Sequence, residues 1–386
     1  MQKNGISKED KIMSKQKILK VKNSDVNSAV NDFLKELLKS GKLSALLVPQ
    51  AVPSKKVVFP VLVSDPNKLD ANVFAPLLPV STAKMISKIT KFQPSDKPIG
   101  VVIHPCQIRA LIELVKLNQA SLNNIIIIGV DCLGTFSVKT YTDLAGKKNP
   151  SDMIFDDLKS NTDKREQYMR SACVVCNQPV PINADIIIGV FGMDTSKEIL
   201  IEATSDTGSK IIEDLKLDSA KDVKKREKHI KDLIDGRTKK LEAFIKDKKK
   251  HVGIDGLTSF FDKCVNCHNC MKVCPICYCR ECLFDSSVFD AEAYKYVKKS
   301  ESKGLFKMPN DSLLFHLGRM NHMILSCVKC GLCEQGCPMD IDLMDVFIPT
   351  AESAQKEFKY HPGKDPQEKV PMIVYREDEY VNVGEK

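Results

Sequence analysis

Eight of the 15 cysteines stand in two runs that share one spacing, C-x2-C-x2-C-x3-C followed by proline. The first run is Cys264, Cys267, Cys270 and Cys274, and the second is Cys327, Cys330, Cys333 and Cys337. In such runs, three closely spaced thiolates bind one [4Fe–4S] cubane, while the cysteine before the proline normally binds the other cluster. The spacing therefore predicts two clusters, the first held by Cys264, Cys267, Cys270 and Cys337 and the second by Cys327, Cys330, Cys333 and Cys274.

The alternative for these runs is structural zinc, which takes four ligands, usually in separated pairs. Two quartets that share one spacing and a terminal proline fit zinc poorly. The segment between the runs, residues 275–326, is longer than in a compact bacterial ferredoxin and carries a helical pattern over 312–326, which we expect Asp311 to cap. The apolar positions of this pattern are Leu314, Leu317, Met320, Ile324 and Leu325. The sequence therefore predicts a mainly helical two-cluster domain.

Four further cysteines lie earlier in the chain. Cys106 and Cys132 each follow an apolar run that predicts a strand, and Cys173 and Cys176 form a C-x2-C pair. Sites collect at strand ends in open α/β sheets, and four thiolates are what one more [4Fe–4S] cluster needs. The alternatives are that Cys106 and Cys132 are small buried apolar residues and that the pair has a zinc or redox role.

Three cysteines remain directly after the first run, namely Cys277, Cys279 and Cys282. A further cluster at these thiols would need a fourth ligand. The candidates for that ligand are His268, His316 and His322, or one of the four earlier cysteines. Because clusters are usually held by four cysteines, two alternatives stay open. The three thiols could pack against the helical segment, or they could tune the neighbouring cluster from outside its ligand shell.

Apolar runs that alternate with amphipathic helices predict an α/β domain over residues 21–209. Its expected strands are 43–48, 57–63 (at an edge, because of Pro60), 98–104, 124–130 and 185–190. Its expected helices are 26–40, capped by Ser24 or Asp25, and 108–117. Around this domain we expect a loose N-terminal arm (1–20), a charged helical linker (210–255), the cluster domain (256–350) and a C-terminal tail (351–386).

The chain has 386 residues, enough for two or three domains. It shows no membrane-spanning apolar run and no signal peptide, so we expect a cytoplasmic protein with reduced cysteines in an anaerobic cell. The net charge of +8 comes mainly from lysine-rich stretches such as 224–250, which we interpret as a solvated helix face rather than a surface for an acidic partner. No nucleic-acid motif accompanies them, and no acid–base pair, P-loop or GxGxxG turn predicts a catalytic residue.

Four segments, in chain order, resemble the coenzyme F420 hydrogenase/dehydrogenase β-subunit family. They are VVIHPCQIRAL around Cys106, IIIIGVDC ending at Cys132, CVVC at Cys173 and ADIIIG beginning at Ala184. With a C-terminal two-cluster module, the architecture is most similar to the β subunit of F420-linked formate dehydrogenases. The segment PICYCREC and residues 315–323 also resemble that module, so the resemblance extends over residues 24–345.

The resemblance implies an electron-transfer subunit that holds FAD and iron–sulfur clusters. Its partners would be the catalytic subunit of a formate dehydrogenase or hydrogenase, and F420, another soluble carrier or a heterodisulfide-reductase-like assembly. It also implies that Cys106, Cys132, Cys173 and Cys176 hold a third cluster near the flavin. Family members carry a Gly-Gly pair close to the flavin, whereas residues 22–29 contain no glycine. The alternative is a flavin-free electron conduit with no small-molecule substrate of its own.

Overall fold

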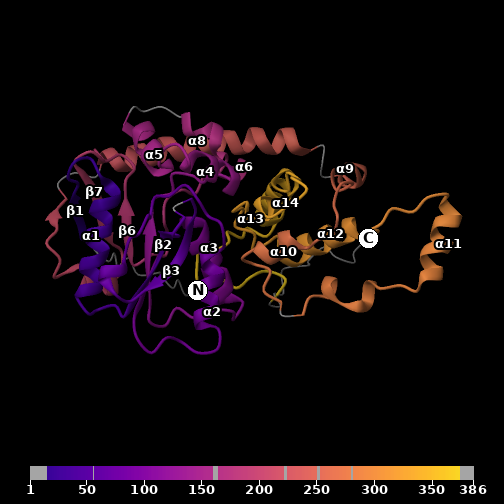
Figure 1. The fold of residues 1–386 in the computed structure, drawn as a ribbon, viewed down its shortest axis with the longest axis horizontal. Coiled ribbons are helices and arrows are strands. Elements are labelled where there is room, and N and C mark those ends of the chain that lie inside the picture. Colours follow the sequence, from indigo (N-terminus) through magenta and orange to yellow (C-terminus); the bar gives the residue numbers. More distant parts are fainter. Residues whose placement is uncertain are drawn as a thin grey trace, which may run out of the picture.

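The computed structural model describes residues 15–54, 56–159, 164–220, 224–249, 253–279 and 281–373. Figure 1 shows an α/β domain beside a mainly helical domain, which confirms the predicted fold class. The α/β domain is built on an 8-stranded sheet with the strand order β3-β2-β4-β5-β6-β7-β1-β8.

The strands are β1 (Lys15–Lys20), β2 (Ala45–Ala51), β3 (Val58–Val63), β4 (Ile99–Ile103), β5 (Ile125–Val130), β6 (Ile186–Gly189), β7 (Glu198–Ala203) and β8 (Asp218–Ser219). The first eight helices are α1 (Val26–Lys39), α2 (Thr82–Thr90), α3 (Pro105–Lys116), α4 (Val138–Ala145), α5 (Pro150–Lys159), α6 (Ser171–Val174), α7 (Asp206–Ile212) and α8 (Lys224–Lys248). They are followed by α9 (Ile254–Phe260), α10 (Asn269–Val273), α11 (Ala293–Lys303), α12 (Ser312–Met323), α13 (Leu332–Gln335) and α14 (Met344–Glu357). Short 3-10 helices are η1 (Pro66–Lys68), η2 (Lys164–Tyr168), η4 (Leu283–Asp285) and η5 (Ser287–Phe289).

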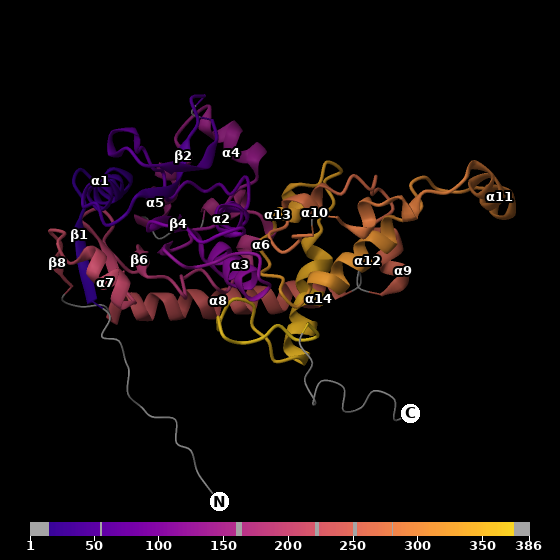
Figure 2. The ribbon, with the colours of Figure 1, turned by 90° about the horizontal axis from the view of Figure 1, so that it is seen from below.

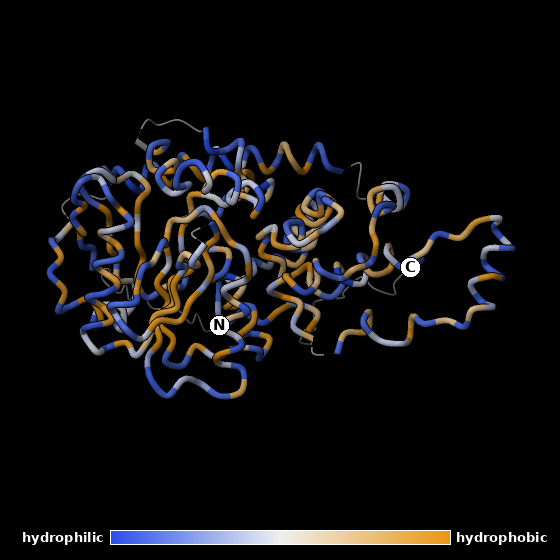
Figure 3. Tube along the Cα trace, in the orientation of Figure 1, coloured by the Kyte–Doolittle hydropathy of each residue, from blue (hydrophilic) through white to orange (hydrophobic). Residues whose placement is uncertain are grey.

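The centre of the sheet forms where the sequence is continuously apolar (Figure 3). Every residue of β4 and of β5 is buried. Strands β2, β4, β5 and β6 pair in parallel, and β3 pairs antiparallel at the sheet edge, as its Pro60 predicts. Parallel neighbours end at the same edge of a sheet, so the loops that carry Cys106 and Cys132 begin side by side.

The first strand lies inside the segment expected to be a loose arm. β1 pairs antiparallel with β7, from Lys15 opposite Ala203 to Lys20 opposite Glu198, so the expectation is wrong for residues 15–20. Residues 1–14 of the expected arm lie outside the described part of the chain. The segment KQKILK has only two adjacent apolar residues, too few to indicate a strand, and β7 was not predicted either.

Helix α8 is more than the charged linker expected over 210–255. It runs along the α/β domain toward the helical domain (Figures 1 and 2). Near its start, Arg226 donates to both carboxylate oxygens of Asp131, which follows β5, at 2.5 and 2.9 Å. A Cβ on Gly192, which has a φ of +71°, would lie 2.6 Å from the Cα of Arg226. Only glycine allows this approach, so α8 is fixed to the sheet.

Helix α12 confirms the helix predicted after Asp311, although its cap and its buried face differ from the prediction. Asp311 makes no cap hydrogen bond with its side chain and instead accepts from Asn266 Nδ2 at 2.9 Å. Leu314 and Leu317, expected on the apolar face, are 54% and 41% exposed. The buried residues are Ser312, Phe315, His316, Arg319, Met320 and Met323. The helix therefore turns an arginine and a histidine inward, toward the cysteine runs.

The two domains share one buried core and a returning C-terminal segment. Ile108 of α3 and Phe347 of α14 belong to the same hydrophobic cluster. After α14, the hydroxyl of Tyr360 donates to the buried carboxylate of Glu113 at 2.7 Å, and the Gly363 amide donates to the same group at 2.8 Å. Residues 351–373 are therefore not a tail, and 374–386 lie outside the described residues. Across the described ranges, every helix is too short or too polar to cross a membrane.

Candidate iron–sulfur centre

The two cysteine runs form loops with the same backbone conformation. Asn266 and Lys329, each two residues after the first cysteine of its run, have φ values of +53° and +57°. His268 and Gly331, each four residues after that cysteine, have φ values of +59° and +70° and precede α10 and α13. These left-handed residues turn each loop so that successive thiols face one region rather than lying along a helix.

The thiol of Cys337 lies with the first three cysteines of the other run. Burial raises the pKa of the Cys270 thiol to about 11, and nearby thiolate charges on Cys264, Cys337 and Cys267 raise it as well. Burial also raises the pKa of Cys264, to which Cys337 and Cys267 again contribute. The structure thus brings together the four residues expected to hold the first cluster.

Cys274 joins the second run in the corresponding way. Burial raises the pKa of Cys333, and the thiolate charges of Cys274 and Cys327 add to this effect. Burial likewise raises the pKa of Cys330 well above its usual value, with Cys106, Cys274 and Cys333 contributing. The four residues expected to hold the second cluster therefore lie together, and Cys106 of the α/β domain is their neighbour.

The four cysteines of the α/β domain also meet. Burial raises the pKa of Cys106 to about 11, and the charges of Cys176 and Cys173 contribute. Burial raises the pKa of Cys132, with contributions from Cys173, Cys106 and Cys176. Cys106 stands in the first turn of α3, after β4, and Cys132 follows β5. The short helix α6 carries Cys173, whose sulfur lies 3.2 Å from the Thr135 hydroxyl oxygen. Strand ends and α6 thus gather the expected third set.

Two buried arginines stand where the thiol sets meet. Burial opposes the charge of Arg170, but the thiolates of Cys173, Cys330 and Cys106 outweigh it and raise its pKa. Its Nε atom donates to the Thr135 hydroxyl at 2.9 Å. Arg170 therefore lies between the third set and the second.

Arg319 has the corresponding place between the second set and the first. Burial again opposes its charge, and the thiolates of Cys270, Cys333, Cys274 and Cys277 raise its pKa. Its guanidinium lies 5.0 Å from the centre of the Phe347 ring and donates to the Cys270 carbonyl at 3.4 Å. Neither arginine was predicted; the signal in the sequence was a charged residue inside an apolar helical pattern, and an arginine three residues before Cys173.

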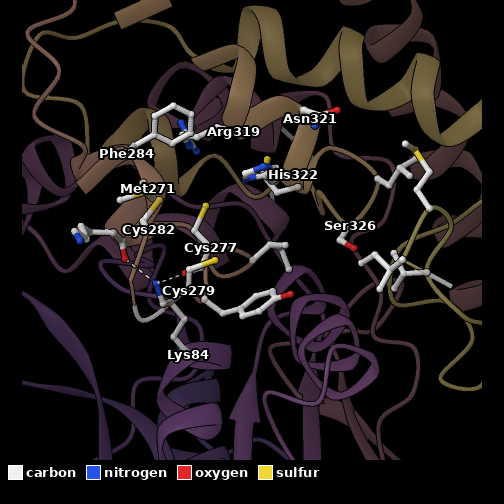
Figure 4. Close-up of a pocket in the computed structure, with 18 of the residues that line it drawn as sticks. Lys84, Met271, Cys277, Cys279, Cys282, Phe284, Arg319, Asn321, His322 and Ser326 are labelled. Carbon is white, nitrogen blue, oxygen red and sulfur yellow. Dashed lines mark hydrogen bonds between the residues drawn. The ribbon is translucent and has the colours of Figure 1, made fainter. Parts of the chain in front are cut away.

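The three remaining cysteines line a separate cavity of about 490 Å³. Figure 4 shows Cys277, Cys279 and Cys282 on its wall together with His322. The other two histidines proposed as ligands are engaged elsewhere. His316 stacks on Phe261 with ring centroids 4.0 Å apart and lies 3.4 Å from the Cys264 sulfur. His268 stacks on Phe315 at 4.2 Å and is paired with Asp285 at 2.8 Å.

The donor set and its spacing fit iron–sulfur cubanes better than zinc. Across the described ranges, no three His, Cys, Asp or Glu side chains are gathered closely enough to hold a single metal ion. Tetrahedral zinc requires four ligands around one point. In a cubane each thiolate binds a different iron. The thiols of such a site therefore lie further apart than the ligands of a single zinc ion.

The strand ends near the third set leave little room for a flavin, whereas a cavity of about 480 Å³ lies beside α1 and is lined by Lys22, Asn23 and Ser28 among others. The cavity beside His104, at the end of β4, measures about 20 Å³, whereas sites for ligands of drug size measure roughly 300–1,000 Å³. Gly134, which follows Cys132 and has a φ of +91°, could have opened the backbone to a ring. A Cβ there would lie 2.4 Å from the Met169 side chain, so this space is filled.

Comparison with known proteins agrees with this site. The family model for the C terminus of the coenzyme F420 hydrogenase/dehydrogenase β subunit matches residues 96–229, and a 4Fe–4S dicluster domain model matches residues 259–341. The F420-dependent formate dehydrogenase subunit β of Methanocaldococcus jannaschii is 30% identical over 321 residues, which cover 74% of this chain and 78% of that protein. The F420-dependent formate dehydrogenase 1 subunit β of Methanococcus maripaludis is 27% identical over 300 residues, or 70% and 74% of the two chains.

Among solved structures, a chain of the F420-reducing [NiFe] hydrogenase complex from Methanosarcina barkeri matches with a TM-score of 0.47 at 14% identity, over 63% of this chain and 94% of that chain. The sequence matches cover both domains of the structure. The chain therefore belongs to the coenzyme F420 hydrogenase/dehydrogenase β-subunit family and carries a 4Fe–4S dicluster domain.

Proposed function

We propose that the chain is the iron–sulfur electron-transfer subunit of an anaerobic oxidoreductase complex. It would connect the catalytic subunit of a formate dehydrogenase or hydrogenase with a soluble carrier or a heterodisulfide-reductase-like partner. The observation that carries the proposal is the continuity of the three four-thiol sets. Cys106 of the third set neighbours Cys330 of the second, and Cys333 of the second neighbours Cys270 of the first. The formate dehydrogenase β subunits among the relatives support the choice of partner.

Clusters bound at these thiols would supply one-electron transfer, and the protein supplies binding and electrostatics. The two ferredoxin-type sets would be held by Cys264, Cys267, Cys270 and Cys337, and by Cys327, Cys330, Cys333 and Cys274. The third would be held by Cys106, Cys132, Cys173 and Cys176. The chain's own contribution is to keep water from the junctions between sets and to place the cations of Arg170 and Arg319 there. Buried positive charge stabilises thiolates and any added electron.

Two forms of this function differ in whether a flavin is present. The resemblance implies FAD on the α/β domain, where a hydride would be split into single electrons. The strand-end cavity of about 20 Å³ and the filled space at Gly134 favour the second form, a conduit without flavin. We propose the conduit and derive no step through a flavin.

Reduction assays on the full chain distinguish these forms. Formate together with the catalytic subunit should bleach the iron–sulfur absorbance of the chain, whereas reduced F420 alone should leave it unchanged. A chain with Cys106→Ser and Cys132→Ser should lose transfer to one partner while keeping the clusters of the helical domain. Rapid bleaching by reduced F420 alone would overturn the conduit in favour of a hydride-accepting subunit, and no bleaching with the catalytic subunit would overturn the proposed partnership.

A further inference from the structure

We propose that Cys277, Cys279, Cys282 and His322 form a fourth [4Fe–4S] site at the surface of the helical domain. The proposal rests on the electron-transfer function above. It adds a site near the surface to the three thiol sets. The four side chains line the same cavity of about 490 Å³ (Figure 4). The three thiols come from the loop after α10, and the imidazole comes from the last turn of α12.

A half-buried lysine holds the loop that presents the thiols. The ammonium of Lys84, on α2, donates to the carbonyls of Lys272, Cys274 and Cys277 at 2.9, 3.1 and 3.1 Å. Hydrogen bonds from a charged donor are stronger than neutral ones. The loop is thus fixed to the α/β domain at the point where the cysteines begin, rather than being free to carry the thiols apart.

A close contact on the other side brings His322 to the same cavity. Phe284, two residues after Cys282, packs so tightly on α12 that a Cβ at Gly318 would lie 2.2 Å from its ring. Residues four apart share one face of a helix, so His322 lies on the face of α12 that Phe284 covers. The loop and the helix therefore offer three thiols and one imidazole to one space, which matches four ligands for one cubane.

The position of the cavity suits an end point for electron transfer. The Cys277 side chain lies next to that of Cys274, which belongs to the second set. Cys279, in contrast, is exposed. The site therefore adjoins a buried set on one side and solvent on the other. A one-electron carrier on a partner could exchange an electron there. This step would transfer an electron only, with no hydride or other group.

Alkylation of the full chain, purified without oxygen, tests the site without any substitution. Exposed Cys279 should resist iodoacetamide in the loaded chain and react rapidly once a chelator has removed the iron. Rapid modification of Cys279 in the loaded chain, with no loss of iron, would overturn the proposal, because a thiolate bound to iron is not free to react.

Iron counts on variants test the ligands separately. The loaded chain should contain about sixteen irons, and the triple variant Cys277→Ser, Cys279→Ser, Cys282→Ser about twelve, at four per cubane. About twelve irons in both proteins would overturn the fourth site while leaving the three-set conduit intact. A loss of the third cluster would instead appear in the Cys106→Ser and Cys132→Ser variant, so the two failures are distinguishable.

The role of His322 has its own readout. Pulsed EPR of the reduced chain should show a nitrogen coupling that disappears in His322→Cys, with the iron content unchanged. The control is His361→Ala, at an exposed position after α14, which should keep the coupling. A nitrogen coupling that persists in His322→Cys, or that is absent from the unmodified chain, would overturn histidine as the fourth ligand.

Discussion

Arg319 and Arg170 are the residues that distinguish this centre from a bare set of thiols. Both are buried, at 2% and 8% exposed, and each lies among thiols of two sets. A buried guanidinium is costly unless negative charge surrounds it. The thiolates and the negative clusters they bind would supply that charge. The two arginines therefore serve as built-in counter-charges at the junctions between sets.

Replacing Arg319 with glutamine should make the neighbouring clusters harder to reduce. The substitution removes a positive charge that favours the added electron. A unit charge about 4 Å away is worth about 4 kcal/mol at an effective dielectric near 20 and about 1 kcal/mol in bulk water. We expect the lowest midpoint potential of the helical domain to fall by roughly 50 mV or more. A redox titration monitored by EPR measures this shift. Arg319→Lys, which keeps the charge, should stay close to the unmodified chain, and equal shifts in both variants would contradict the electrostatic role.

Lys84 shows how one side chain can hold two elements together. Lys84→Met should release the loop after α10, because three carbonyl acceptors lose their charged donor. Loss of about 1–2 kcal/mol from the loop corresponds to roughly a 5–30-fold change in its opening equilibrium. We therefore expect iron to be lost to a chelator several-fold faster than from the unmodified chain. Lys88→Met, one turn further along α2 and exposed, is the matched control; equal release from both variants would show that Lys84 does not hold the loop.

The return of the C-terminal segment is a second contact between elements. The hydroxyl of Tyr360 donates to Glu113 and accepts from Lys116 Nζ at 3.0 Å, and Glu113 is fully buried. Tyr360→Phe should lower the free energy of unfolding by about 1–3 kcal/mol, because a buried carboxylate loses a donor. Anaerobic urea unfolding measures the change. Tyr294→Phe on α11, where the side chain is 61% exposed, should have almost no effect, and an equally small effect at Tyr360 would argue against this contact.

The sequence predicted the elements that carry a local signal. The apolar strands β4 and β5, and helix α1 with Asp25 as its cap, were expected and are present. β1 was missed because its pairing with β7 depends on residues far along the chain. The buried face of α12 was misjudged because Arg319 and His316 point inward, toward thiols contributed by other segments. Patterns within one segment cannot show such partners.

A cysteine set could be predicted from the sequence when its members lie close together along the chain. The two runs specify their own ligands by spacing, whereas Cys106, Cys132, Cys173 and Cys176 come together only through the parallel sheet and α6. The cavity with Cys277, Cys279 and Cys282 depends on contacts with α2 and α12, which no motif describes. For the same reason Lys84, which holds that loop from the α/β domain, was not expected.

The whole molecule places its thiol sets along the contact between its two domains. The shared core joins α3 of the α/β domain to α10, α12 and α14 of the helical domain. Beyond that contact, the segment with α11 projects away from the body of the protein (Figures 1 and 2). Residues with exposed apolar side chains there include Val288, Tyr294, Val297 and Leu305. The thiol sets and the surface cavity lie on the body of the protein rather than in this projecting segment.

The most direct test of the account is the content of iron, sulfide and flavin in the full chain, purified and measured without oxygen. Three sets of four thiols predict at least about twelve irons and as many sulfides per chain, rising to about sixteen if the fourth site is loaded, at four irons per cubane. The conduit form proposed here predicts no flavin in the same sample. About eight irons per chain would contradict the account. The thiols at the strand ends would then hold no cluster, and the α/β domain could not pass electrons to the helical domain.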